Sequence, residues 1–213
     1  MNRVETALIN SAPRRALQRL YEAPLLARLG GRIPGATAVE IGCGSGYGTK
    51  LILDKFGAAR VDAVDLDPAM IARASRRLRR YEGRVQLAVG SATDLMGSLG
   101  ATDGAYDAVF DFAIIHHIPE WRDALAEAAR VLRPGGRFFF EEVTATALAR
   151  PSYRILFDHP QQDRFNAGEF LAELPRHGLD PADRWCTRIG SDYLLGVARR
   201  RGPINTSGPD PNH

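Results

Sequence analysis

Short apolar runs alternate with amphipathic segments through most of this chain. The runs have the length and the Val, Leu, Ile and Phe content of buried parallel strands, and they predict strands at 38–41, 61–65, 84–89, 107–111 and 137–142. The segments between them place apolar residues at helical spacing and predict helices that begin at Thr49, Pro68 and Glu120. This alternation predicts an α/β fold, with a mostly parallel sheet and helices on both faces.

The later part of the chain has a different pattern. A helix is expected at 169–177, where Gly178 ends it. The runs at 185–189 and 193–198 flank a Gly-Ser-Asp turn and predict a β-hairpin. Between the last parallel strand and this helix, residues 143–168 contain two prolines and a polar run, which is typical of a lid or a substrate-binding insertion.

The chain therefore divides into segments of different character. Apolar residues at helical spacing predict helices at 14–21 and 24–29 before the first strand, and residues 134–136 predict a turn into the fifth strand. The last residues are polar and contain three prolines. We expect a helical cap at 1–35, one domain at 36–200 with a lid insertion at 143–168, and a disordered tail at 201–213.

The most informative stretch follows the first strand. Glycines occupy positions 42, 44, 46 and 48, so the strand passes through a glycine turn into a helix. Glycine permits positive φ and lets a ligand approach the backbone closely, as in the first crossover of nucleotide-binding sheets. The spacing matches neither a phosphate-binding P-loop nor the Gly-x-Gly-x-x-Gly motif of dinucleotide-binding enzymes.

A carboxylate at the end of the second strand completes this pattern. Asp65 lies 21 residues after Gly44 and is placed to accept both hydroxyls of a ribose. The acid, the glycine loop and the segments 106–110 and 130–136 resemble the class I S-adenosylmethionine (SAM)-dependent methyltransferases in order and spacing. The resemblance covers residues 36–142 and implies a seven-stranded sheet whose last strand is antiparallel.

The resemblance also implies the cofactor site. SAM is the expected cofactor and S-adenosylhomocysteine its product. Asp65 would bind the ribose, and Glu40 the methionine amino group directly or through the loop. Ser91 replaces the usual acid, which weakens the adenine contact or moves it to Asp94, and the Ala92 N–H would still donate to the adenine. Tyr21 either contacts the methionine carboxylate or anchors its helix. The expected cofactor-binding residues are Tyr21, Glu40, Gly42, Cys43, Gly44, Gly46, Asp65, Leu66, Ala92 and Asp111.

Candidate catalytic residues follow the fourth and fifth strands. His116 and His117 lie just beyond strand four, and Glu142 ends strand five. A histidine suits removal of a proton from an alcohol near neutral pH, and Glu142 either orients it or relays the proton. The arrangement resembles bacterial sugar O-methyltransferases, although in other relatives one histidine packs or holds a loop. His159, beside Asp158 in the insertion, is the alternative base.

The resemblance thus implies methyl transfer to a hydroxyl of a small molecule, a saccharide or another hydroxylated metabolite. Two other functions stay open: a nucleic-acid methyltransferase and a SAM-binding protein without catalysis. A net charge of +3 gives little attraction for phosphate, so no nucleic-acid partner is expected. We expect no metal site, because Mg²⁺ prefers sites richer in carboxylates than one formed by His116, His117, Glu142 and His159.

The composition is typical of a globular domain. The chain has 213 residues, of which 45% are apolar, enough for one domain with a substantial core. The sequence contains no apolar run of membrane-spanning length and no recognisable signal peptide, and two cysteines make no disulfide framework. We expect a cytoplasmic protein without a membrane partner, either a monomer or a homodimer.

Overall fold

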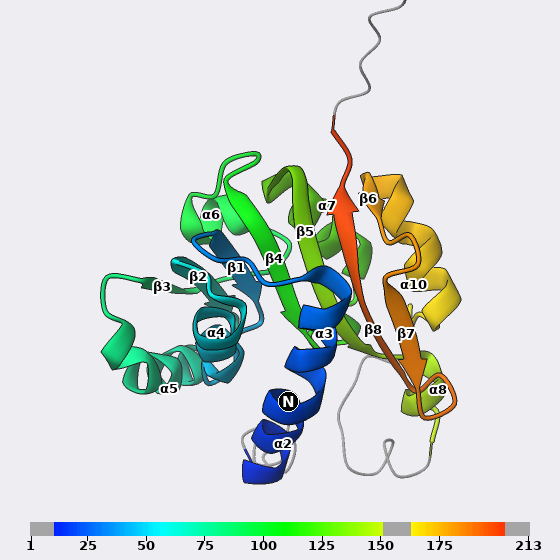
Figure 1. Cartoon of the computed structure of the whole chain (residues 1–213), viewed down its shortest axis with the longest axis horizontal. Helices are drawn as coiled ribbons and strands as arrows, with labels where there is room; N and C mark the ends of the chain where they lie inside the picture. Colours follow the sequence, from blue (N-terminus) through cyan, green and yellow to red (C-terminus); the bar gives the residue numbers. More distant parts are fainter. Residues whose placement is uncertain (1–10, 151–162, 203–213) are drawn as a thin grey trace, which may run out of the picture.

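The computed structural model describes residues 11–150 and 163–202, and the described chain is built on one sheet (Figure 1). The strand order is β3-β2-β1-β4-β5-β8-β6, with β7 also paired to β8. The strands are β1 (Thr37–Ile41), β2 (Arg60–Asp65), β3 (Val85–Val89), β4 (Tyr106–Phe112), β5 (Leu132–Val143), β6 (Leu179–Asp180), β7 (Trp185–Arg188) and β8 (Tyr193–Arg200).

This sheet confirms the expected α/β class. Strands β1 to β5 run parallel, and β8 is antiparallel to β5. The expected hairpin is formed by β7 and β8. The described sheet has eight strands instead of the expected seven, because Leu179–Asp180 adds a two-residue strand at the edge. So short a strand has no hydrophobic period to recognise.

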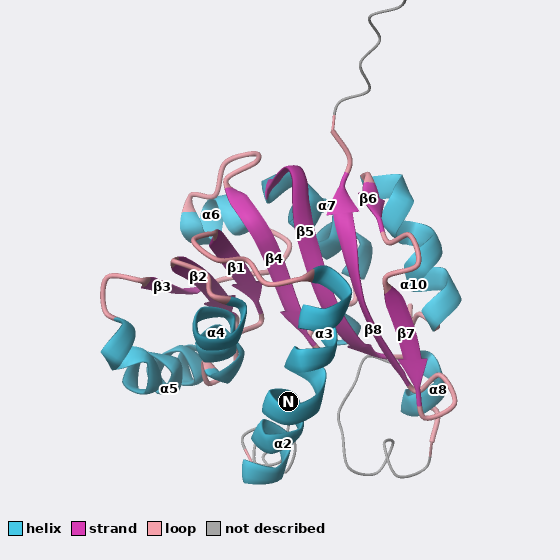
Figure 2. Ribbon diagram, viewed as in Figure 1, coloured by secondary structure: helices cyan, strands magenta, loops and turns pink. Residues whose placement is uncertain are grey.

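Helices cover both faces of the sheet (Figure 2). One face is packed by α3, α4 and α5, and the other by α6, α7 and α10. The helical segments are α2 (Ala12–Leu17), η1 (Gln18–Glu22), α3 (Ala23–Gly30), α4 (Tyr47–Leu51), η2 (Ile52–Phe56), α5 (Pro68–Leu78), η3 (Arg79–Tyr81), α6 (Leu95–Leu99), η4 (Ile115–His117), α7 (Trp121–Val131), α8 (Ala145–Leu148), α10 (Ala167–Glu173) and η5 (Leu174–His177).

Local sequence signals explain several helix ends. The Asp67 carboxylate accepts from the Ala69 N–H at 2.7 Å, and Pro68 occupies the first turn of α5. Asn166 and Glu169 form a reciprocal capping box at the start of α10. Gly178 adopts a φ of 72° where η5 ends. None of the helices in the described ranges has the length and apolarity needed to cross a membrane.

The structure corrects two expected boundaries. The helices expected at 14–21 and 24–29 form one continuous helical segment. The π-helical turn η1 directly precedes Pro24, and the Ala23 N–H donates to the Gln18 carbonyl five residues back, so the segment accommodates the missing N–H of the proline. Strand β5 begins at Leu132, before the expected turn at 134–136. These residues lie within a register irregularity between β4 and β5, so they act as a bulge.

Strand β5 separates two hydrophobic cores. Phe138 and Phe140 belong to the cluster that includes α7 and α10, whereas Phe139 stacks on Phe110 with ring centroids 4.5 Å apart in the other cluster. All three β5 phenylalanines are fully buried, as expected for a central strand. The same alternation sends the next two residues, Glu141 and Glu142, to opposite faces at the carboxyl end of the strand.

Candidate functional site

The glycine loop is tied directly to the acid at the end of β2. The Gly44 N–H donates to Asp65 Oδ2 at 2.7 Å, and the Cys43 N–H donates to the Val64 carbonyl at 2.8 Å. The other oxygen of Asp65 accepts from the Asp67 N–H at 2.9 Å. Burial raises the pKa of Asp65, while these two N–H groups lower it. The carboxylate is thereby fixed at the carboxyl edge of the sheet, where ligands of such folds bind.

The glycines of the loop have different surroundings. A Cβ added at Gly44, whose φ is 51°, would meet no atom within 4 Å. A Cβ at Gly42 would lie 2.2 Å from Ile114, and one at Gly46 would lie 2.9 Å from Leu78. At Gly48 the nearest atom is Glu40 Oε1, at 1.9 Å. Gly44 is therefore the position open to a ligand, and the others allow close packing.

An apolar ledge lies beside Asp65. Leu66 is 72% exposed and Val89, the β3 partner of Asp65, is 53% exposed. Met96 on α6, which contacts β3, is 48% exposed. Ala92 is buried in the turn after β3. Exposed apolar side chains next to a fixed carboxylate fit a nucleoside, since the base packs on the ledge and the ribose reaches the acid.

Glu40 and Cys43 lie beneath the loop. Glu40 is 1% exposed, and its carboxylate accepts a hydrogen bond from the hydroxyl of Thr49 in α4. Burial raises the pKa of Glu40 to about 8. Burial also raises the pKa of the Cys43 thiol. Both residues are buried, and Glu40 contacts the helix that follows the loop.

The turn after β4 is held from the end of β5. Ala113 has a φ of 63°, and its N–H donates to the Glu141 carbonyl at 2.7 Å. Glu142 accepts from the Ile115 N–H at 2.7 Å and from the His116 N–H at 3.2 Å. Its Oε2 also contacts His116 Nδ1 at 2.6 Å. The side chain of Glu142 thus fixes both the backbone of this turn and one histidine ring.

The two histidines differ sharply. The side chain of His116 is 4% exposed, and burial lowers the pKa of His116 to about 3. A neutral imidazole beside a carboxylate acceptor must carry its proton on Nδ1. His117 is only partly buried, and its ring centroid is 4.2 Å from that of His116. His159 lies outside the described residues.

The described residues leave a small hollow beside His116. The ring borders a hollow of about 10 Å³ that is also lined by Leu148 of α8 and Phe165. Such a volume holds at most one water molecule. Among the described residues this hollow is too small for an acceptor molecule, whereas His117 is partly exposed on the same turn.

A buried ionic cluster on the opposite face was not foreseen from the sequence. Arg14 Nη2 donates to Glu141 Oε1 at 3.0 Å, and Nη1 donates to the Glu22 carboxylate. Glu22 and Glu141 are 7% and 3% exposed. Arg14 and Glu141 are 127 positions apart, so no local spacing indicates their contact.

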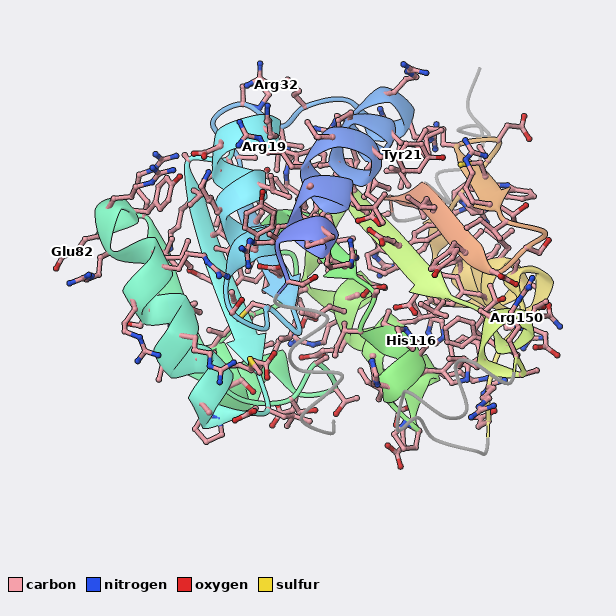
Figure 3. The ribbon with its side chains drawn as sticks, turned by 90° about the horizontal axis from the view of Figure 1, so that it is seen from below. Arg19, Tyr21, Arg32, Glu82, His116 and Arg150 are labelled. Atoms are coloured by element: carbon pink, nitrogen blue, oxygen red, sulfur yellow. The ribbon has the colours of Figure 1, made fainter. Side chains whose placement is uncertain are left out.

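Tyr21 lies on this same helical segment. Its hydroxyl accepts a 2.6 Å hydrogen bond from Arg188 Nε in β7, and the residue is 43% exposed. Figure 3 shows Tyr21 and His116 on opposite sides of the sheet. The structure therefore shows the anchoring contact for Tyr21, while contact with the cofactor stays a prediction.

The described residues fit SAM and show no metal centre. The open backbone at Gly44, the fixed Asp65 and the apolar ledge match the donor set of a nucleoside with a flexible polar arm. Residues 11–150 and 163–202 contain no group of three or more His, Cys, Asp or Glu residues that could hold a metal ion.

Comparison with known proteins identifies the domain. Residues 38–136 match the family described as "Methyltransferase domain". A probable S-adenosylmethionine-dependent methyltransferase of Mycolicibacterium smegmatis is 37% identical over 177 residues, which are 83% of this chain and 65% of that protein. A ubiquinone biosynthesis O-methyltransferase of Xanthomonas campestris is 32% identical over 55% of this chain and 47% of its own length.

Solved structures show the same fold. The N-methyltransferase NodS of Bradyrhizobium japonicum, in complex with S-adenosylhomocysteine, has a TM-score of 0.67 at 21% identity, covering 93% of this chain and 97% of that one. The chain spans less than two thirds of the length of the curated relatives it matches first. Taken together, the family match, the sheet and the glycine loop with its acid identify residues 38–136 as a class I, Rossmann-like, SAM-dependent methyltransferase domain.

Proposed function

We propose that the protein transfers a methyl group from SAM to a hydroxyl of a small molecule, a saccharide or another hydroxylated metabolite, with His117 as the general base. The observation that carries the proposal is the open backbone at Gly44. Its N–H binds Asp65, and it lies at the same sheet edge as the turn that bears His117.

SAM would be held by residues from three segments. Asp65 would accept the ribose hydroxyls, the ledge of Leu66 and Val89 would pack on the base, and the backbone around Gly44 would face the methionine part. Bound SAM supplies a methyl group already activated on a sulfonium. The protein's own task is therefore chiefly to align the acceptor and to remove its proton.

His117 suits that proton transfer better than His116. A base must be reachable by the acceptor and must be basic near neutral pH. His116 is buried and its pKa is lowered to about 3, whereas His117 is partly exposed on the same turn. In this proposal, His116 orients the turn and Glu142 orients His116. The segments 1–35 and 143–168 would form the acceptor pocket.

The cofactor part is tested by calorimetric titration with SAM and S-adenosylhomocysteine. Wild type is expected to bind both at about micromolar Kd, and Gly44→Ala and Asp65→Ala to lose at least about tenfold in affinity. Gly135→Ala is the matched control, because Gly135 also has a positive φ, 77°, and open surroundings, but lies in the bulge at the opposite sheet edge. Equal losses in Gly44→Ala and Gly135→Ala would point to backbone strain instead.

The acceptor part is tested by screening hydroxylated compounds and amines for S-adenosylhomocysteine production. We expect turnover of a hydroxylated compound, and a loss of about 10²-fold or more in kcat for His117→Ala. Turnover of amines alone would overturn the hydroxyl assignment, since the relatives include an N-methyltransferase as well as an O-methyltransferase. Binding of SAM without any turnover would favour the non-catalytic alternative, and retention on heparin the nucleic-acid alternative.

A further inference from the structure

Two buried acids meet beneath the turn after β4. Asp111 of β4 and Glu142 of β5 both have 0% exposure and face the α7 side of the sheet. Glu142 lies two residues beyond Phe140, the β5 partner of Asp111, so the two acids are diagonal neighbours on one face of the sheet. A hydrogen bond between the two side chains is among the causes that shift the pKa of both. Two ionised carboxylates in contact inside a protein repel strongly, so such a contact needs either a cation or a proton.

No cation reaches this pair within the described residues. Among the described residues no ion pair includes Asp111, and the ion-pair contact of Glu142 is with His116. Two further acids, Glu40 of β1 and Glu141 of β5, interact unfavourably with Asp111. His116, which contacts Glu142, is kept neutral by its burial. A proton is therefore the means by which the contact between the two carboxyl groups is stabilised.

The hydrogen-bond donors show which acid carries that proton. Glu142 accepts from the Ile115 N–H, the His116 N–H and His116 Nδ1. Asp111 Oδ1 accepts from the Ile114 N–H at 3.0 Å, but Asp111 Oδ2 is buried without any donor. A proton on Oδ2 lets Asp111 donate to Glu142 and leaves no polar atom of the pair unpaired.

We propose that Asp111 and Glu142 share one proton, carried by Asp111, and that this pair is the positioning device for the turn Ile114–His117. The same turn packs Ile114 against Gly42 of the glycine loop and presents His117. The buried pair thus positions both the residue that packs on the glycine loop and the proposed base. The effect of this pair on catalysis rests on the proposed function. The protonation of the pair and its hydrogen bonds to the turn do not depend on that function.

The electrostatics agree with this assignment. Burial and the neighbouring Glu142 raise the pKa of Asp111 well above its ordinary value. Burial raises the pKa of Glu142 to about 7, against the pull of the N–H groups that it accepts from. Both directions agree with one proton on the pair, and the donors around Glu142 place the remaining negative charge on Glu142.

Substitution by the isosteric amides tests the assignment, because Asp111 is proposed to donate a hydrogen bond whereas Glu142 only accepts them. Asparagine at 111 supplies an N–H donor to Glu142 and an oxygen for the Ile114 N–H, so Asp111→Asn keeps every hydrogen bond. Glutamine at 142 turns an NH₂ group toward backbone N–H groups, so Glu142→Gln breaks at least one. We expect Glu142→Gln to weaken S-adenosylhomocysteine binding at least about tenfold by calorimetry, and to weaken it more than Asp111→Asn does.

Two further readouts do not depend on activity. In ¹⁵N NMR, His116 should show the Nδ1–H tautomer in wild type and Asp111→Asn, with a changed ring-proton shift in Glu142→Gln. Glu141→Gln is the control, since it lies on the opposite face of the same strand. Near pH 8, folding of wild type should take up one proton more than folding of Asp111→Asn, measured as the pH slope of the unfolding equilibrium. With one proton of difference, the ratio of the two unfolding equilibrium constants changes tenfold per pH unit.

The sign of this slope follows from Asp111. An acid whose pKa is raised in the folded state binds a proton on folding, so stability falls as pH rises above the unfolded pKa. Equal proton uptake by wild type and Asp111→Asn would overturn the proposal. An equal loss of S-adenosylhomocysteine affinity in Asp111→Asn and Glu142→Gln would also overturn it. If Glu142→Gln does not fold, wild type still tests it, because the infrared band of a protonated carboxyl group must weaken in Asp111→Asn. If wild type binds no SAM, the proposed function fails. The pH slope of the unfolding equilibrium and the His116 tautomer still test whether Asp111 and Glu142 share a proton.

Discussion

Glu141 and Glu142 are consecutive, chemically identical and both buried, yet the protein compensates them in different ways. Glu141 faces the N-terminal helix, where the Arg14 guanidinium bridges it to Glu22. Glu142 faces the turn after β4, where it meets Asp111 and accepts from two backbone N–H groups and one imidazole. One acid is paired with a long cationic side chain, and the other is enclosed by fixed donors.

This difference indicates that the surroundings of Glu141 and of Glu142 tolerate substitution to different degrees. An arginine that is 26% exposed can adjust to an altered partner, and water can replace part of what it supplies. Backbone N–H groups in a buried turn have no such freedom, so losing their acceptor leaves them unpaired. The Glu142 face should therefore be the more fragile, and the following substitutions test that expectation.

The largest effect is expected for Glu142→Leu. It leaves the Ile115 N–H, the His116 N–H and the proton of Asp111 without an acceptor in a buried site. We expect the free energy of unfolding to fall by about 3–5 kcal/mol, measured by urea denaturation near neutral pH. A loss below about 1 kcal/mol would remove the contrast between the two faces.

Arg14→Met should have a smaller effect that depends on pH. Without the guanidinium, the pKa of Glu141 rises further above its unfolded value, because Arg14 lowers it now. The pKa of Glu141 is already raised well above its ordinary value in wild type, so both proteins fold with Glu141 protonated at low pH. The extra cost in the variant appears only above the wild-type folded pKa and disappears below it. We expect a loss of about 2 kcal/mol near pH 8 that shrinks steadily toward pH 5 in thermal unfolding at each pH. A pH-independent loss would instead indicate lost packing by the arginine stem.

Glu141→Gln sharpens the comparison with Glu142→Gln. Burial already favours the neutral form of Glu141 by raising its pKa, and the amide can still accept from Arg14 and donate to Glu22. We expect the unfolding free energy to fall by about 1 kcal/mol or less. Chemical denaturation of both glutamine variants in parallel measures the difference, and a larger loss at 141 than at 142 would reverse our ranking of the two faces.

The smallest effect is expected for Tyr21→Phe. The change removes one exposed hydrogen bond, between the Tyr21 hydroxyl and Arg188 Nε. We expect a loss of about 0.5 kcal/mol in unfolding free energy and no change in SAM affinity. A clear loss of SAM affinity by calorimetry would show that Tyr21 contacts the cofactor and does more than anchor its helix.

The parts of the fold that follow a local rule were predictable from the sequence. Strands β1 to β5 are apolar runs, and α5 begins where Asp67 and Pro68 indicate. The two-residue β6 and the bulge at 134–136 were missed or misread, because pairing with a neighbouring strand defines them. The continuous helix through Pro24 was also missed, since proline usually marks the start of a helix and the π-helical turn before it has no local sequence signal.

For the site, the sequence indicated the residue types but not their surroundings. The glycine spacing pointed to Gly44 and Asp65, which the structure joins by a hydrogen bond. It did not indicate that a small hollow lies beside His116, or that Asp111 meets Glu142, because both depend on contacts between strands distant in sequence. The role of His159 in the insertion stays a prediction.

The position of β8 has a consequence for how the protein is made. This strand pairs with β5 on one side and with β6 and β7 on the other. It follows all of them in the chain, so a ribosome releases β5, β6 and β7 before the strand that joins them. During synthesis the Leu132–Val143 edge stays open and able to pair wrongly. We expect chains stalled before Tyr193 to need chaperones and complete ones to close the sheet in a late step.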